Sequence, residues 1–317
     1  MVKIAIAGAS SQLAREILDA LVAAQKHEII GLVRKDPAQL PVLPGVKYVK
    51  TTYEDKSELV GLLQGVEVLM CFFPAQFDPI QKRLIDAAVE AGVKRYVPSE
   101  WATGTKLEDA LDGIFWYAGK VEISRYLENL NKEKKVIEYT KFQVGTFMNY
   151  LGHPHKTSKY VSTISFLFDF EKQHATPLKD RLDDVIVWTH VRDIAGVVAR
   201  AVEYEGEWPA VGGISGSRVT VGEMLQLGEA IGKPFTVDWF KLEDIEAEER
   251  NMDRFATFDF HKSPPEEFAA FMDVALKGCL LGISRGAYDV TDEWNKLLPD
   301  YKFTQVEDFV KEVWGGK

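Results

Sequence analysis

The sequence predicts an α/β fold, a doubly wound parallel sheet with a smaller, interleaved α+β lobe. Strand-like and helix-like segments alternate through the first half of the 317-residue chain. Among them, Val66–Phe73 is a continuous apolar run apart from Glu67, as expected for a strand buried on both faces of a parallel sheet. The length suits one large domain or two unequal ones. We expect the doubly wound domain at 1–150 and a partly interleaved lobe at 151–317, since no Pro/Gly-rich linker separates them.

The elements of the first half follow a regular order. A β-branched run, Val2–Ala7, ends at Gly8, and Gln12–Ala24 then carries apolar residues at helical spacing. Further strands are predicted at His27–Val33, Val46–Lys50, Val66–Phe73, Arg95–Pro98 and Val136–Phe142, with helices at Lys56–Leu63, Pro79–Ala91 and Phe115–Asn131. Strands separated by single helices indicate right-handed βαβ units.

The second half is less regular. Lys159–Phe170 alternates in polarity, which predicts a hairpin or an edge strand. A strand at Val185–His190 precedes the helix Val191–Tyr204, with Asp193 expected as a helix cap. The remaining predictions are a helix at Arg218–Ile231 capped by Thr220, a strand at Phe235–Phe240, and helices at Leu242–Asn251 and Pro265–Leu281.

Composition narrows the class of protein. The net charge of -10 argues against a general nucleic-acid binder, because neutralising phosphates needs a basic face. Cys71 and Cys279 lie in apolar runs and are expected as buried free thiols of a reducing compartment. The six histidines show no metal-ligand spacing, so we expect no metal. The start lacks the features of a signal peptide, and no apolar stretch reaches ~20 residues. We therefore expect a cytoplasmic monomer or homodimer that binds neither membrane nor nucleic acid.

The segment between the first strand and the first helix has the position of a dinucleotide-binding loop. It reads Gly8-Ala9-Ser10-Ser11-Gln12-Leu13-Ala14, with small residues at its first, fourth and seventh positions. Small residues there let the backbone approach a cofactor diphosphate and leave amides free at a helix N-terminus. Only Gly8 is a glycine, so a plain strand-to-helix turn is the alternative.

The end of the second strand favours NADP(H) over NAD(H). NAD-binding domains usually place a carboxylate there, on the ribose 2′-hydroxyl. This chain has Arg34 and Lys35, two cations that can pair with a 2′-phosphate. The alternative is a solvated pair of surface charges.

Three further segments are expected at the crevice where strands end. Phe72, Phe73 and Pro74 follow the fourth strand, where they can pack beside a cofactor or form simple core. Ser99 can hydrogen-bond a substrate or a nearby base, or cap a turn. Lys120 has apolar neighbours on a predicted helix, where it can donate to the nicotinamide ribose and lower the pKa of a bound hydroxyl, or remain solvated.

These segments together resemble the NmrA-like branch of the atypical short-chain dehydrogenases/reductases, and within it the isoflavone-reductase-like group. The resemblance rests on the glycine loop, on Leu32-Val33-Arg34, and on Lys120 about twenty residues beyond Ser99. The family run K-R-F-x-P-S-E-F-G corresponds to Lys94-Arg95-Tyr96-Val97-Pro98-Ser99-Glu100-Trp101-Ala102. The likeness is strong up to about Met148 and diffuse after it.

The resemblance implies NADPH binding and a set of site residues. The cofactor would lie on Gly8, Ala9, Ser10, Ser11, Gln12, Leu13 and Arg34, with Phe142, Val144 and Gly145 flanking the nicotinamide. Lys120 would contact the nicotinamide ribose and assist proton transfer. Trp101, Phe147, Asn149, Tyr150 and His153 would line the substrate side.

The chain departs from the family pattern in places. The loop lacks the second and third glycines, and Trp101-Ala102 replaces the usual aromatic and glycine. Tyr117 lies three residues before Lys120 rather than four, which still makes them neighbours on a helix. Ser99, Tyr117 and Lys120 are therefore candidate catalytic residues outside the conventional Ser–Tyr–Lys arrangement.

Two functions follow as hypotheses. The first is an NADPH-dependent reductase of a small aromatic or polyketide-like molecule. The second is a non-catalytic NADP(H)-sensing regulator of NmrA type, although such regulators tend to lack the lysine found here at position 120. A third hypothesis, a binding scaffold without a cofactor, would require Gly8 and Arg34 both to occupy their positions by chance.

Overall fold

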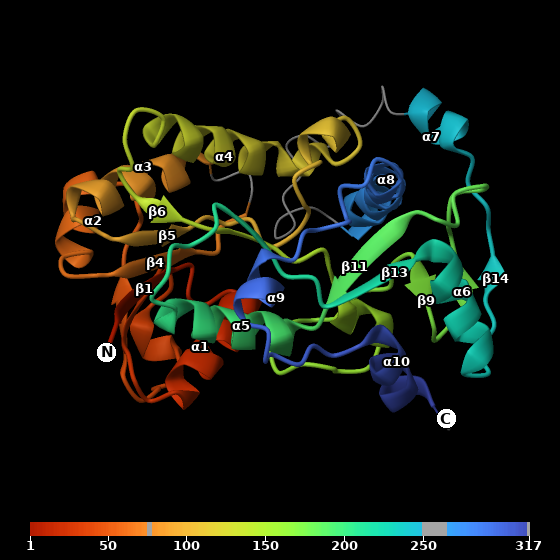
Figure 1. Ribbon diagram of the computed structural model, residues 1–317, viewed down its shortest axis with the longest axis horizontal. Helices are drawn as coiled ribbons and strands as arrows, with labels where there is room; N and C mark the ends of the chain where they lie inside the picture. The colour runs from red at the N-terminus through yellow and green to blue at the C-terminus, as the bar shows by residue number, and fades with distance from the viewer. Residues whose placement is uncertain (75–77, 249–264, 316–317) are drawn as a thin grey trace.

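The computed structural model describes residues 1–74, 78–248 and 265–315 (Figure 1). Its main sheet has six parallel strands in the order β3-β2-β1-β4-β5-β6. The strands are β1 (Lys3–Ala7), β2 (Glu28–Val33), β3 (Val46–Lys50), β4 (Val68–Cys71), β5 (Arg95–Val97) and β6 (Glu138–Tyr139). This confirms the predicted doubly wound α/β fold. The order reverses between β1 and β4, so a ligand crevice is expected at their carboxyl ends.

Helices cover both faces of this sheet (Figure 1). On one face α1 (Gln12–Ala23) packs against α5 (Val191–Glu203), and on the other lie α2 (Lys56–Leu62), α3 (Asp78–Glu90) and α4 (Ala118–Leu130). The side chains of β1 alternate between the two layers. Ile4 and Ile6 join the α1–α5 core, while Ala5 and Ala7 join the core beneath α2, α3 and α4.

The second lobe has its own core and interleaves with the first. The strand β8 (Thr146–Phe147) pairs with β11 (Val185–Thr189), which also pairs with β13 (Ser217–Thr220), and β7 (Lys141–Gln143) pairs with β12 (Val211–Gly213). A third small sheet joins β9 (Phe168–Asp169), β10 (His174–Ala175) and β14 (Thr236–Val237). The helices here are α6 (Val221–Ala230), α7 (Leu242–Glu248), α8 (Pro265–Ser284), α9 (Glu293–Leu297) and α10 (Val306–Trp314).

Several local predictions need correction. Residues 159–170 were predicted to form a hairpin or an edge strand; a hairpin does form, but it uses only β9 of this segment, paired with β10, and the amides of Tyr160 and Ser162 bond to α1 instead of a strand. Residues 218–220 belong to β13, although Thr220 does cap α6. The cap of α5 is His190 rather than Asp193, whose carboxylate accepts from the Thr304 amide at 2.7 Å. Positions 249–251 of one predicted helix lie outside the described residues.

The cysteines and the lengths of the helices can be assessed over the residues that the structure describes. Cys71 and Cys279 are buried free thiols, as predicted. None of the helices in the described ranges is both long and apolar enough to span a bilayer.

Candidate active site

The glycine loop is shaped by close contacts at the carboxyl end of β1. Gly8 has a φ of +76°, and a Cβ there would lie 2.9 Å from the Phe72 carbonyl oxygen, so only glycine fits without strain. Its amide donates to the Leu32 carbonyl at 3.1 Å and to the Tyr53 hydroxyl at 3.0 Å. The Tyr53 hydroxyl in turn donates to Leu32 at 2.7 Å. Tyr53, which sequence reasoning missed, therefore fastens the loop to the end of β2.

The start of α1 offers unsatisfied polar groups beside this loop. Ser11 occupies the N-cap position without making a capping bond, and its buried hydroxyl has no hydrogen-bond partner. The first amides of a helix also lack partners within the helix. Ala9 and Leu13 bury their side chains in the core, so only their backbone atoms can contact a ligand bound at the loop. A dinucleotide diphosphate would satisfy these groups, and the loop fits one.

The cations predicted for the 2′-phosphate lie close to this loop. Arg34 and Lys35 are exposed directly after β2 ends at Val33. Leu32 pairs with Ala7, and its carbonyl accepts from the Gly8 and Ala9 amides, so the end of β2 that precedes Arg34 lies beside the loop. The side chain of Gln12, another predicted cofactor residue, donates instead to the Ser162 hydroxyl at 3.1 Å.

An aromatic stack crosses the strand ends next to the loop. The Trp101 ring lies 4.6 Å from Phe72 and 5.3 Å from Phe142, nearly parallel to both, and its indole N–H donates to the Cys71 carbonyl at 2.9 Å. Phe73 packs edge-on against Tyr53, and Pro74 is exposed.

The segment predicted to flank the nicotinamide is only partly accessible. The side chains of Phe142 and Val144 are fully buried in the core, so they support this region rather than present a surface to a ligand. Gly145 has a φ of +68°, and a Cβ there would lie 2.2 Å from the Val187 carbonyl.

Lys120 lies in the first turn of α4 and buries its side chain against the end of β5, with 9% of its surface exposed. Its ammonium donates to the Ser99 carbonyl at 2.9 Å and to the Glu100 carbonyl, and lies 4.9 Å from the centre of the Tyr117 ring. Burial lowers the pKa of Lys120, while the negative charge of Glu100 opposes the change. Burial likewise raises the pKa of Glu100, opposed by Lys120 and Lys141. Lys120 and Glu100 are thus a buried amine and acid whose charges stabilise each other.

The Ser99 hydroxyl is already engaged. It donates to the Phe73 carbonyl at 2.5 Å, and the Ser99 amide donates to the Gln81 side chain at 2.8 Å. The first bond ties the end of β5 to the end of β4, and the second ties it to α3. Ser99 therefore supports the Lys120 position through its carbonyl, and its hydroxyl proton is committed elsewhere.

An aromatic cavity of about 230 Å³ lies beside these residues. It brings together Trp101, Tyr117, Gly145, Phe147 and Tyr150 from the predicted site. The other lining residues are Ala102, Trp116, Thr146, Ile164, Phe166, Phe271, Met272, Ala275, Cys279 and Tyr288. Among these described residues none carries a formal charge, so the cavity suits an uncharged, largely aromatic molecule.

Two residues predicted on the substrate side do not line this cavity. Asn149 is fully buried, and its amide group donates to the Thr157 carbonyl at 3.1 Å and accepts from the Val191 amide at 2.9 Å. His153 lies in a loop, with its Nδ1 3.3 Å from the Thr163 hydroxyl. Both side chains hold loops of the second lobe in place.

Sequence reasoning also missed a thiol and two hydroxyls in the cavity wall. The Tyr288 hydroxyl donates to the Cys279 sulfur at 3.0 Å, and burial raises the pKa of Cys279 to about 12. The Thr146 hydroxyl is buried without a hydrogen-bond partner. No local motif marks these residues, because they come from separate segments.

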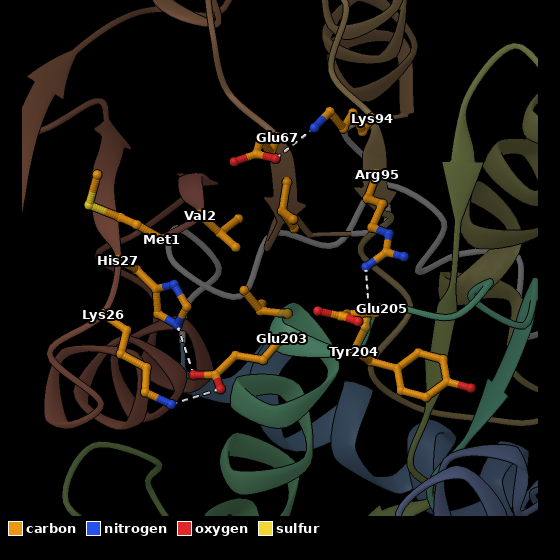
Figure 2. Close-up of a pocket in the computed structure, with 12 residues that line it drawn as sticks. Met1, Val2, Lys26, His27, Glu67, Lys94, Arg95, Glu203, Tyr204 and Glu205 are labelled. Atoms are coloured by element: carbon orange, nitrogen blue, oxygen red, sulfur yellow. Dashed lines mark hydrogen bonds and ion pairs between the residues drawn. The ribbon is translucent and has the colours of Figure 1, made fainter.

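A second hollow, of about 550 Å³, lies at the opposite edge of the sheet, where β1, β2, β4 and β5 begin (Figure 2). Several of its charged side chains pair with each other, as in Lys26–Glu203 at 2.9 Å and Lys94–Glu67 at 2.7 Å. The His27 ring is buried, with Nε2 3.5 Å from the Glu203 carboxylate. Within the described ranges no three His, Cys, Asp or Glu side chains gather as metal ligands.

The strand order and the glycine loop define a nucleotide-binding protein of the Rossmann class. More specifically, the chain belongs to the NmrA-like family, whose model matches residues 2–236. An oxidoreductase of Botryotinia fuckeliana is 26% identical over 237 residues, which cover 73% of this chain and 76% of that protein. A bifunctional pinoresinol-lariciresinol reductase of Linum perenne is 22% identical over 300 residues, 84% of this chain and 82% of that protein.

Solved structures show the same fold. A structure from a study of pinoresinol-lariciresinol and phenylcoumaran benzylic ether reductases superposes with a TM-score of 0.73 at 17% identity, covering 99% of this chain and 100% of that one. AtPrR2 with NADP+ and (+)pinoresinol gives 0.70 at 18% identity, with 98% of each chain covered. A quinone oxidoreductase of Escherichia coli complexed with NADPH gives 0.68 at 20% identity, covering 98% of this chain and 100% of that one.

Proposed function

We propose that the protein is an NADPH-dependent reductase of a small, uncharged aromatic or polyketide-like molecule. The observation that carries the proposal is the position of the buried Lys120, whose ammonium lies at the carboxyl end of β5 and 4.9 Å from the centre of the ring of Tyr117, a residue that lines the aromatic cavity. Relatives described as oxidoreductases and reductases, and similar folds solved with NADP+ or NADPH, support it.

The cofactor would be held at the first strand-to-helix turn. The first backbone amides of α1 and the Ser11 hydroxyl would receive the diphosphate, Gly8 would let the backbone approach it, and Arg34 with Lys35 would pair with the 2′-phosphate. When bound, the nicotinamide supplies the hydride. The stacked rings of Phe72 and Trp101 provide an apolar wall at the strand ends.

Lys120 and Tyr117 would manage the proton in this reaction. Burial lowers the pKa of Lys120, so its Nζ exchanges a proton more readily than an exposed lysine does. Burial raises the pKa of Tyr117, which keeps its hydroxyl protonated as a donor in the cavity wall. The Tyr117 ring contacts the Lys120 ammonium at 4.9 Å and also lines the cavity, where Phe147 and Tyr150 would contact the apolar face of the substrate.

One observation favours a second function. The Lys120 ammonium already donates to two backbone carbonyls and does not line the cavity. A lysine used in this way can be structural, which would suit a non-catalytic NADP(H)-sensing regulator of NmrA type.

NADPH oxidation against a panel of aromatic enones, ketones and lactols separates the two functions. The reductase is expected to consume NADPH with at least one member of the panel. Tight NADP+ binding together with no turnover on any of them would reject the reductase and favour the sensor.

A further inference from the structure

Residues 158–166 cross the start of α1 and then enter the wall of the aromatic cavity. This segment, here called the strap, forms no strand, so no sheet ladder receives its amides. Backbone amides outside a helix or sheet need other acceptors, either side chains or water. Side chains of α1 provide them, although they lie about 145 positions away in the sequence.

The contacts follow one face of α1. The Gln12 side chain exchanges two hydrogen bonds with Ser162, accepting from its amide at 3.0 Å and donating to its hydroxyl at 3.1 Å. One turn later the Glu16 carboxylate accepts from the amides of Tyr160 at 2.6 Å and Val161 at 3.3 Å. Positions 12 and 16 are neighbours on a helix, so together they match three consecutive amides.

Side-chain contacts add to this backbone clamp. The Arg15 guanidinium lies 3.8 Å from the centre of the Tyr160 ring. The Asp19 carboxylate accepts a hydrogen bond from the Lys159 ammonium at 2.6 Å. Val161 is 4% exposed and packs into the core beneath α1. The strap is therefore fixed to the same helix whose first turn follows the glycine loop.

The other end of the strap forms part of the cavity. Ile164 and Phe166 line it, two and four residues after Ser162. Ser165, between them, donates to the Asp169 carboxylate at 2.5 Å, which fixes the far end of the strap at β9. The position of Ile164 and Phe166 thus depends on anchors at both ends, and the near anchor is α1.

We infer that Glu16 is a positioning residue, which holds the strap so that Ile164 and Phe166 complete the substrate cavity. Because Gln12 lies in the turn expected to receive the cofactor, the strap also links the two binding sites. The kinetic part of this inference rests on the proposed reductase function, but the structural part does not.

The test compares Glu16→Ala with two matched variants. Glu16→Gln keeps one acceptor oxygen, and Asp19→Asn alters a carboxylate on the same helix face that bonds only side chains. Glu16→Ala is expected to raise the KM for substrate about tenfold, with kcat and the Kd for NADPH within about twofold, because two charge-assisted bonds are lost. Glu16→Gln and Asp19→Asn are expected to stay within about threefold of the unaltered protein.

Two readouts do not depend on activity. Trypsin is expected to cut Glu16→Ala faster at Lys156 and Lys159 than it cuts the unaltered protein. In the unaltered, ligand-free protein, the amides of residues 160–162 should exchange hydrogen about tenfold more slowly than those of the exposed turn at 132–134. This exchange measurement decides the structural claim even if Glu16→Ala fails to fold.

The outcomes separate the two claims. An unaltered protein without turnover on any substrate, but with slow exchange at 160–162, would reject the reductase and keep the strap. Fast exchange at 160–162 would overturn the strap. A Glu16→Ala variant with unchanged KM and unchanged trypsin sensitivity would do the same.

Discussion

Replacing Lys120 by methionine removes the amine while keeping a side chain of similar length. The change leaves the Ser99 and Glu100 carbonyls without the donor they share. A buried group left unsatisfied costs about 1–3 kcal/mol, so the loss of the donor to two carbonyls is expected to cost about 2–6 kcal/mol of folding stability. Most of this range lies below the 5–15 kcal/mol typical of a folded protein, so we expect the variant to remain folded.

The effect on turnover should be much larger than the effect on binding. General acid–base assistance contributes about 10²–10⁴-fold, so kcat is expected to fall by at least about a hundredfold. The glycine loop and Arg34 are unchanged in this variant, so the Kd for NADPH should change little.

Single-turnover oxidation of NADPH, followed by its absorbance, measures the chemical step, and calorimetry measures the Kd. Lys132→Met is the matched control, because Lys132 is exposed just beyond the end of α4. The control should match the unaltered protein in both measurements. A folded Lys120→Met variant that turns over within about threefold of the unaltered protein would refute the assigned role of the amine.

Three further changes test other parts of the structure. Gly145→Ala should destabilise the fold by more than about 3 kcal/mol in denaturant titrations, because its Cβ would meet a carbonyl at 2.2 Å, whereas Gly61→Ala, with open space around it, should be neutral or stabilising. Tyr53→Phe removes the hydroxyl that fastens the glycine loop and should weaken NADPH binding about tenfold in calorimetry; unchanged affinity would contradict this. Burial lowers the pKa of His27, so the unfolded chain takes up the proton first as the pH falls, and stability is lost below about pH 6.5. His27→Leu should therefore reduce the drop in melting temperature between about pH 7 and pH 5, and an identical drop would count against the assignment.

The sequence predicted those parts of the fold whose cause is local. The alternation of Val2–Ala7 with Gln12–Ala24 predicted the first βα unit, because hydrophobic period follows directly from secondary structure. The predicted cap at Thr220 formed for the same reason, since a capping box involves residues three apart.

The strap shows why other parts could not be predicted. Its alternating pattern favoured a hairpin or an edge strand. Three of its amides, at 160–162, bond instead to Gln12 and Glu16, which are about 145 residues away in the sequence. Asn149 was expected on the substrate side, yet Thr157 and Val191 approach it in space and satisfy its amide group. In each case the deciding partner comes from a distant segment, which no local pattern records.

The residues of the candidate site also separate into those that a local pattern predicted and those that only the fold reveals. Gly8, Lys120 and Trp101 stood out because of their spacing in a recognisable run. Tyr53 and Glu100 did not, because their importance comes from burial and from neighbours supplied by the fold.

The central claim is that a phosphorylated dinucleotide rests on the turn after β1, with its 2′-phosphate held at the end of β2. Calorimetric titration of the protein with NADPH and with NADH tests this directly, together with an Arg34→Ala/Lys35→Ala variant. We expect NADPH to bind at least about tenfold more tightly than NADH, and the double variant to lose that preference while binding NADH unchanged. Equal affinities, tighter binding of NADH, or no heat with either nucleotide would contradict the claim.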